Sequence, residues 1–223
     1  MLSKNHLNKI LVSVIAILFI AEFSPSSYAN SSDTKHIVVF GDSLSAAYGI
    51  DIDQGWVHLL DDFLNNEYQQ ENTPKIRYQI SNASVSGETT TGGLARLEHT
   101  LQELKPDLVL LALGANDGLQ GHPIAKISQN IDNMLDIIES NNTQVALFGI
   151  SIPASYGPRY IDQFRNIFPT IATQRNVPFF DLYQEDFFLT PGLMQNDRLH
   201  PTAKAQPIVR DLIFNFLLEQ QLL

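Results

Sequence analysis

The stretch HIVVFGDSLSAAYGI at residues 36–50 joins an apolar, strand-like segment to Gly41-Asp42-Ser43 and then to small residues suited to a helix start. Ser and Asp are frequent in turns and at helix N-termini, where their side-chain oxygens accept backbone N–H groups. A serine at the carboxyl end of a parallel strand also faces the crevice in which open α/β sheets bind ligands. The stretch is typical of a strand followed by a turn in an α/β fold, and by itself it leaves Ser43 with two candidate roles, one structural and one catalytic.

Short apolar runs alternate along the chain with longer amphipathic segments. The strand-like runs are residues 37–40, 76–80, 108–113, 144–150 and 178–182. Within 124–138, apolar residues recur at spacings of three and four, which places them on one face of a helix. The same pattern, less regular, occurs at 56–68, 90–104, 159–175 and 204–220. This order predicts one α/β domain, a three-layer α/β/α sandwich around a parallel sheet of about five strands.

Residues 1–29 have the three-part layout of a secretory signal peptide. Two lysines within residues 1–9 precede an apolar run at 10–21, and Ser27-Tyr28-Ala29 fits a small-x-small cleavage site. The competing interpretation is a membrane anchor, but about twelve helical residues reach only ~18 Å, short of a ~30 Å hydrocarbon core. We expect cleavage after Ala29, a mature domain at 30–223 without a stable membrane anchor, and a periplasmic or secreted bacterial location.

The composition excludes several classes of function. The chain has no cysteine, which rules out disulfides, a thiolate nucleophile and attachment of lipid to cysteine. Cleavage would remove two lysines and one glutamate, changing the formal net charge from −10 to −11. Such a surface repels nucleic acid and anionic lipid headgroups. We therefore expect a monomer that acts on a small molecule, with no nucleic-acid partner, no cofactor and no metal.

Polar residues follow the first three predicted strands and precede the last predicted helix. They are Gly41-Asp42-Ser43, the stretch 82–89, the stretch 114–118 and Asp197-Arg198-Leu199-His200-Pro201. Because the carboxyl ends of parallel strands share one edge of the sheet, the first three should lie together. The fourth enters that edge from a long loop.

These stretches contain the groups that acyl hydrolysis needs. Ser43 is the candidate nucleophile, and His200 is a candidate general base. Asp197 lies three residues before the histidine, so one tight turn can present both side chains on the same side. The backbone N–H groups of Ser43 and Gly87 and the side-chain amide of Asn116 can supply three donors to an oxyanion.

Each feature also has a structural explanation when it is taken alone. Asp-x-x-His before a proline is common at helix caps, residues 116–118 can form a simple turn, and Gly87 can be a left-handed residue. Their combination at one sheet edge favours catalysis. The Gly-x-Ser-x-Gly elbow of ordinary α/β-hydrolases is absent, since Ser45 stands at its second glycine. Residues 51–62 begin like a calcium-binding loop but do not complete one, because the glycine comes one position early and Asp62 stands where the final glutamate is required.

In these motifs the chain resembles the GDSL or SGNH hydrolases, specifically their branch of secreted thioesterases, lysophospholipases and arylesterases. The matching blocks are FGDSLSAAYG, NASVSGETTTGG, LGANDGL and DRLHP, and they span essentially the whole mature chain. The resemblance implies a flavodoxin-like fold with a catalytic triad of Ser43, Asp197 and His200. It also implies an oxyanion hole built from Ser43, Gly87 and Asn116. Asp42 and Asp117 match motif positions too, and we interpret them as residues that brace their loops.

The sequence favours hydrolysis of acyl esters and thioesters through an acyl-enzyme. Apolar loop residues are expected to bind the acyl chain, namely Leu119, Ile152, Pro153 and Tyr156. Two alternatives stay open: deacetylation of a carbohydrate, and binding of acyl chains without catalysis. The second is disfavoured because a binding protein has no need of Asp-x-x-His beside a serine.

Overall fold

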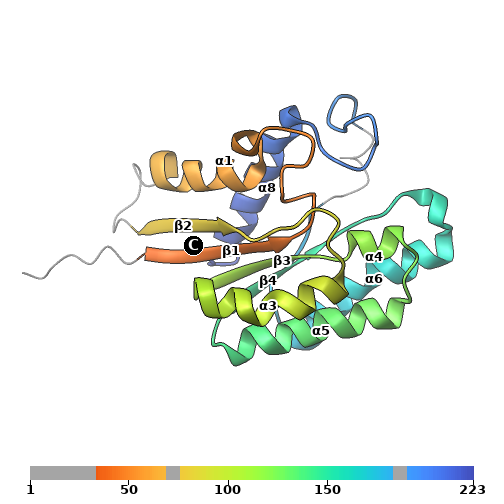
Figure 1. The fold of residues 1–223 in the computed structure, drawn as a ribbon. Coiled ribbons are helices and arrows are strands. Elements are labelled where there is room, and N and C mark those ends of the chain that lie inside the picture. The colour runs from red at the N-terminus through yellow and green to blue at the C-terminus, as the bar shows by residue number, and fades with distance from the viewer. Residues whose placement is uncertain (1–33, 69–75, 183–189) are drawn as a thin grey trace, which may run out of the picture. The chain divides into compact units, whose positions relative to one another are not determined.

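The computed structural model describes residues 34–68, 76–182 and 190–223, so the predicted signal peptide lies outside the described residues. Five strands form one fully parallel sheet in the order β2-β1-β3-β4-β5 (Figure 1). The strands are β1 (Thr34–Gly41), β2 (Arg77–Asn82), β3 (Leu108–Ala112), β4 (Gln144–Gly149) and β5 (Phe179–Asp181). The predicted parallel sheet of about five strands is confirmed.

Helices cover both faces of this sheet, which confirms the three-layer sandwich (Figure 1). One face packs against α3 (Thr90–Leu104), α5 (Ile124–Ser140) and α6 (Pro158–Arg175). The other packs against α1 (Trp56–Phe63), which continues into a π-helical turn at Leu64–Tyr68, and α8 (Gln206–Glu219). A short helix, α4 (Ala115–Leu119), follows β3, and 3₁₀ turns occur at Ile52–Gln54, Ala154–Tyr156 and Ala203–Ala205.

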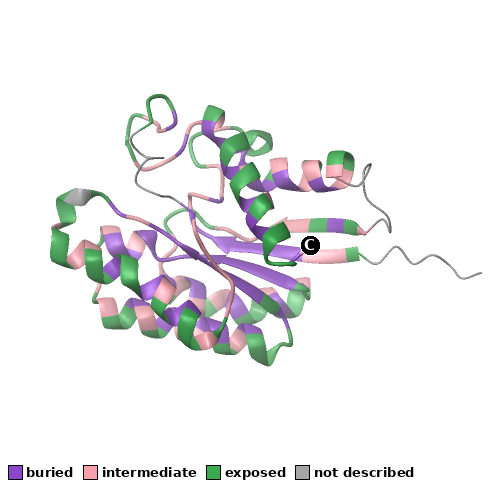
Figure 2. Cartoon of the chain, turned by 180° about the vertical axis from the view of Figure 1, so that it is seen from behind, coloured by how far each residue is buried: buried purple, intermediate pink, exposed green. Residues whose placement is uncertain are grey.

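Side chains of the central strands alternate between the two cores, because successive residues of a strand point to opposite faces. On β1, Val38 and Phe40 enter the core under α3, α5 and α6, whereas Ile37 and Val39 enter the core under α1 and α8. All of these are fully buried, as the central strands in Figure 2 show. Burial on both faces explains why the strands read as continuous apolar runs rather than as alternating patterns.

The segment directly after Ser43 departs from the prediction, because no helix starts there. Residues 42–50 form consecutive turns, and α1 begins only at Trp56. Ala47 and Gly49 adopt φ angles of 57° and 77°, which a right-handed helix cannot contain. A Cβ at Gly49 would collide with the side chain of Gln195, so the chain passes close to the later loop there. Tertiary contact with that loop outweighs the local preference of small residues for a helix.

The parallel arrangement brings the polar loops to one edge of the sheet. Gly41 at the end of β1 pairs in register with Ala112 at the end of β3, so the loops that follow begin side by side. In the ranges that the structure describes, none of the helices has both the length and the apolar character needed to cross a membrane.

Candidate active site

Three polar side chains from opposite ends of the chain form a continuous relay at this edge. The Nε2 atom of His200 lies 2.8 Å from Oγ of Ser43, and its Nδ1 atom lies 2.7 Å from Oδ2 of Asp197. Both distances are those of good hydrogen bonds. Ser43 follows β1, whereas Asp197 and His200 lie in the turn before α8, so the sheet and the last helix together position the relay.

A tight turn holds the aspartate against the histidine. Oδ1 of Asp197 accepts the backbone N–H groups of Leu199 at 2.9 Å and His200 at 3.1 Å, which leaves Oδ2 for the imidazole. Partial burial raises the pKa of Asp197, but these three hydrogen bonds outweigh burial and hold it below its usual value. The carboxylate therefore stays ionised, as a group that orients an imidazole and stabilises its positive charge must be.

Tyr48 packs against the histidine, a contact that no sequence signal indicated. Its ring centroid lies 4.4 Å from that of His200, at an interplanar angle of 37°. Nε2 of Gln195 donates to the carbonyl oxygens of Tyr48 at 2.8 Å and of Pro201 at 3.0 Å. Gln195 thus ties the loop after β1 to the turn that carries His200.

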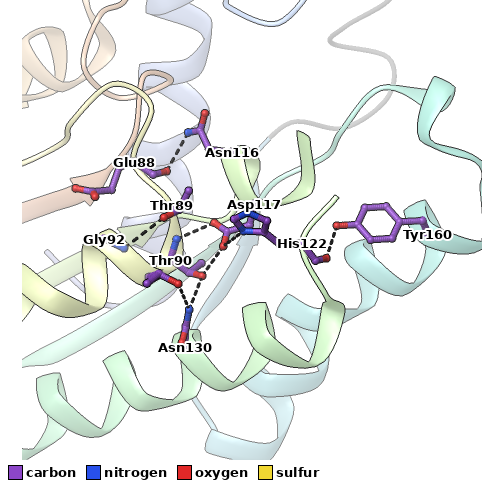
Figure 3. Close-up of polar contacts among 10 residues, drawn as sticks. Glu88, Thr89, Thr90, Gly92, Asn116, Asp117, His122, Asn130 and Tyr160 are labelled. Carbon is purple, nitrogen blue, oxygen red and sulfur yellow. Dashed lines mark hydrogen bonds and ion pairs between the residues drawn. The ribbon is translucent and has the colours of Figure 1, made fainter. Parts of the chain in front are cut away.

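The predicted oxyanion donors lie beside the relay. Asn116 is at the start of α4, and its Nδ2 atom donates to the carbonyl oxygen of Glu88 at 2.9 Å (Figure 3). Its contact with Oδ2 of Asp42 is long, at 3.4 Å, so one amide hydrogen has no strong protein partner among the described residues. Gly87 has a φ angle of 81°, and a Cβ there would meet nothing within 4 Å. Backbone conformation rather than lack of space therefore favours glycine at this position.

The two other motif carboxylates brace their loops, as the sequence interpretation proposed. Oδ1 of Asp42 accepts the N–H of Leu44 at 3.0 Å, and the whole residue is buried. Burial raises its pKa to about 7. Asp117 is also buried and accepts hydrogen bonds from the backbone N–H and the hydroxyl of Thr90, both at 2.7 Å (Figure 3). His122, at 3.2 Å from Asp117, is not among the residues that line the cavity described below.

An ion pair that the sequence did not indicate supports the loop containing Gly87. Nε of Arg96 on α3 lies 2.5 Å from Oε2 of Glu88, and the guanidinium stacks 4.0 Å from the centroid of the Phe40 ring. A Cβ at Gly92 would collide with the Glu88 carboxylate, so glycine leaves room for this pair at the start of α3. Since the carbonyl of Glu88 also accepts from Asn116, the pair connects α3 to the candidate oxyanion donor.

A cavity of about 630 Å³ opens beside Ser43 and His200. Apolar side chains form much of its wall, and polar groups gather at the relay. The lining residues are Ser43, Leu44, Tyr48, Ser86, Gly87, Ala115, Asn116, Leu119, Ser151, Ile152, Pro153, Ile161, Arg165, Arg198, Leu199 and His200. This volume suits a small ligand with an apolar portion.

Three of the four predicted substrate-binding residues line this cavity: Leu119, Ile152 and Pro153. Tyr156 is not among the lining residues. Its hydroxyl donates to the carbonyl oxygen of Leu119 at 2.8 Å, so it supports a lining residue from outside. No sequence signal indicated four further lining residues, Tyr48, Ile161, Arg165 and Arg198. Nothing in local spacing marks a residue that enters a site through long-range packing.

The chemistry available to this arrangement is nucleophilic catalysis at an acyl carbon. A serine hydroxyl within hydrogen-bond reach of an imidazole can lose its proton to that imidazole as it attacks. The ionised carboxylate on the opposite ring nitrogen stabilises the imidazolium that results. Asn116 lines the same cavity as Ser43 and His200, and its weakly engaged amide hydrogen is of the kind that donates to an oxyanion.

The parallel α/β/α sandwich, with its serine–histidine–aspartate relay at the carboxyl edge, defines a hydrolase of the serine type. Residues 39–207 match the model of the GDSL-like lipase/acylhydrolase family. Because the match covers well over half of the chain, this protein belongs to that family.

Named relatives support the assignment. The chain is 42% identical over 171 residues to esterase TesA of Pseudomonas aeruginosa, covering 77% of this chain and 82% of that protein. It is 36% identical over 183 residues to thioesterase 1/protease 1/lysophospholipase L1 of Escherichia coli K12, covering 82% of each. Among solved structures, the psychrotrophic esterase EstA from Pseudoalteromonas, inhibited by monoethylphosphonate, superposes with a TM-score of 0.76 at 39% identity, covering 84% of this chain and 98% of that one.

Proposed function

We propose that this protein hydrolyses carboxylic esters and thioesters of acyl chains through an acyl-enzyme formed on Ser43. The observation that carries the proposal is the relay from Ser43 through His200 to Asp197, with spacings of 2.8 and 2.7 Å, at the wall of an apolar cavity. The names of the relatives, an esterase and a thioesterase/lysophospholipase, support the same class of substrate.

In the first half of the reaction, Oγ of Ser43 attacks the acyl carbon and its proton passes to Nε2 of His200. The carbonyl π electrons move to oxygen, and the oxyanion accepts N–H groups from Ser43, Gly87 and Asn116. The tetrahedral intermediate collapses as the bond to the leaving oxygen or sulfur breaks, and His200 donates its proton to that atom. In the second half, water attacks the acyl-serine by the same route and releases the acid.

An active-site label tests the assignment of the nucleophile. A fluorophosphonate probe should phosphonylate the wild-type enzyme at Ser43, and Ser43→Ala should take up no label. Ser45→Ala is the matched control, because Ser45 lies two residues away and is buried, and it should keep the label. Label located by mass spectrometry on Ser84 or Ser86 would show that another serine is the nucleophile.

Chain-length preference tests the acyl substrate. The apolar wall formed by Leu119, Ile152 and Ile161 should favour esters with several methylene groups over acetyl esters, because each buried methylene contributes about 0.8 kcal/mol. The kcat/KM of nitrophenyl esters should therefore rise from acetate to longer acyl chains. A maximum at acetate, together with release of acetate from acetylated sugars, would instead favour carbohydrate deacetylation.

We also propose that the protein is exported, with residues 1–29 removed as a signal peptide. The support is the basic lead, the short apolar run and the small-x-small site at 27–29. Material from a secreting host should begin at Asn30 by N-terminal sequencing, and a chain that begins at residue 1 or 2 would contradict the proposal.

A further inference from the structure

The candidate active-site cavity carries a charge opposite to that of the chain. The protein has 24 acidic and 14 basic side chains apart from histidine. Among the described residues that line the cavity, two are arginines, Arg165 and Arg198, and none is acidic. An acidic protein repels an anionic ligand at long range, so arginines in this wall provide a local site of opposite sign.

The two arginines differ in their surroundings. Arg165 on α6 lines a smaller pocket together with Asp181, and its charge lowers the pKa of that carboxyl against the larger raising effect of burial. Among the described residues, no hydrogen bond or ion pair reaches the side chain of Arg165. In the described part of the chain, no hydrogen bond or ion pair reaches the side chain of Arg198. The adjacent carboxylate of Asp197 is already engaged by Leu199 and His200. Asp181 therefore offsets part of the charge of Arg165, whereas the carboxylate next to Arg198 is engaged elsewhere, so the charge of Arg198 is the more available of the two to a ligand.

Arg198 also has an unusual and well-defined backbone. Its φ angle is 59°, in the left-handed region that residues other than Gly, Asn and Asp rarely adopt. Its N–H donates to the carbonyl oxygen of Gln195 at 3.0 Å. The N–H of Gln195 in turn donates to the carbonyl oxygen of His200 at 2.8 Å. Strained residues that the surrounding structure holds in place are concentrated at functional sites, and Arg198 is such a residue.

The proton transfer by His200 indicates which part of the substrate lies near Arg198. His200 returns its proton to the leaving alcohol or thiol, so the leaving group departs on the histidine side of the cavity. Arg198 lies two residues before His200 in the same turn and lines the same cavity. Leu119 is in α4, Ile152 is in the loop after β4 and Ile161 is in α6; these apolar side chains suit the acyl chain.

We propose that the Arg198 side chain binds an anionic group, phosphate or carboxylate, carried by the leaving alcohol or thiol of the substrate. The planar guanidinium presents its N–H donors in a geometry that matches both anions. The inference rests on the proposed acyl hydrolysis and specifies its substrate: an acyl ester or thioester with a negatively charged leaving group. Such a phosphate occurs in lysophospholipid headgroups and in phosphorylated thiol carriers.

Matched substrate pairs separate this charge effect from catalysis itself. One pair is octanoyl-pantetheine and octanoyl-pantetheine 4′-phosphate, and the other is monooctanoylglycerol and 1-octanoylglycerol 3-phosphate. The measured quantity is the ratio of kcat/KM for the charged member to that for the neutral member. The variants are Arg198→Gly, which fits the left-handed backbone without strain, and Arg198→Lys. Arg159→Gln is the control, because Arg159 is an exposed residue of α6 that does not line the cavity.

Arg198→Gly should lower the ratio about fivefold for at least one pair, the size expected for a partly exposed ion pair. The change should lie mainly in KM of the charged substrate, and kcat/KM of the neutral one should stay near wild type. Arg198→Lys should retain part of the preference, and 0.5 M salt should reduce the wild-type ratio towards that of Arg198→Gly. A response in the glycerol pair alone identifies a lipid headgroup, and a response in the pantetheine pair alone identifies a thiol carrier.

Equal ratios in wild type, Arg198→Gly and Arg159→Gln for both pairs would overturn the anion subsite while leaving hydrolysis intact. Failure of the proposed function would look different, because the wild-type enzyme would then hydrolyse neither member of either pair.

Discussion

At the scale of single residues, Asn116 is distinguished by an amide that is only partly engaged. One N–H is held by the carbonyl oxygen of Glu88 at 2.9 Å, and the other makes only a long contact of 3.4 Å with Oδ2 of Asp42. Asn116 lines the cavity that Ser43 also lines. If that hydrogen meets the oxyanion, its contribution grows in the transition state, and its loss lowers kcat more than it raises KM.

We expect Asn116→Ala to lower kcat by about 10²–10³-fold, the usual effect of losing one oxyanion donor. Steady-state kinetics with a nitrophenyl ester measure this, alongside thermal denaturation to verify the fold. Asn133→Ala, on the outer part of α5, should leave both quantities near wild type. A folded Asn116→Ala enzyme with kcat within a few-fold of wild type would remove Asn116 from the oxyanion hole.

Asp42 makes a separate prediction about pH and stability. Its carboxyl loses its proton near pH 3.8 in the unfolded chain but only near pH 7 when buried in the fold. Because the folded state then binds the proton more tightly, the Asp42 contribution is complete below about pH 4 and is lost as pH rises through 7. The loss amounts to about 4 kcal/mol at about 1.4 kcal/mol per pKa unit.

The side chain of the Asp42→Asn variant cannot ionise. The unfolding free energy of the wild type should therefore fall relative to that of the variant between pH 4 and pH 7. Urea denaturation at a series of pH values measures it, and carboxyls common to both proteins, such as Asp197, cancel in the difference. Parallel stability curves over this range would contradict the raised pKa.

At the scale of elements, three helices meet at one buried polar cluster behind the candidate site. The hydroxyl of Thr90 on α3 donates to Asp117 on α4 at 2.7 Å and accepts from Asn130 on α5 at 2.9 Å (Figure 3). Asp117 is adjacent to Asn116, so the same cluster that joins the helices also places the start of α4. Buried polar clusters of this kind stabilise a fold only when their members are satisfied.

Thr90→Val keeps the shape of the side chain but removes the hydroxyl, so we expect a loss of about 1–3 kcal/mol in unfolding free energy. Thr91→Val is a close control, because Thr91 also accepts from Asn130, at 3.0 Å, but is exposed. Its loss should stay below that of Thr90→Val in urea denaturation. Equal losses of unfolding free energy in the two variants would show that burial of the cluster does not add to stability.

At the scale of the whole domain, two apolar cores share one sheet. Leu110 and Leu111 are consecutive, fully buried residues of β3, and they belong to the cores on opposite faces. The only tryptophan, Trp56, lies in the core on the Leu110 side, so its fluorescence reports on that side alone. Since both cores are formed by the same strands, neither should unfold without the other.

Leu110→Ala and Leu111→Ala should each cost about 2–5 kcal/mol, because each leaves a cavity in a packed core. In both variants, unfolding followed by Trp56 fluorescence and by far-ultraviolet circular dichroism should coincide. Leu212→Ala, on the exposed part of α8, should change stability by less than about 1 kcal/mol. Two separated transitions in Leu111→Ala would show that the cores unfold independently.

The sequence alone determined the elements and the identities of the candidate catalytic side chains. Continuous apolar runs such as 108–113 predict central strands because both faces are buried, and the spacing of residues 124–138 predicts a helix because one face is buried. Both signals are local, since they depend on the period of a single element. The motif residues Ser43, Asp197 and His200 could likewise be named from their residue types, order and placement at element ends.

Only the tertiary structure decided what those residues touch. The hydrogen bond between Ser43 and His200 joins positions 157 residues apart, and the stacking of Tyr48 on His200 spans a similar separation. The turns that replace the expected helix after Ser43, and the presence of Arg198 in the cavity wall, have the same origin. Local sequence carries no record of such contacts, because they arise from how the loops pack once the sheet has brought its carboxyl ends together.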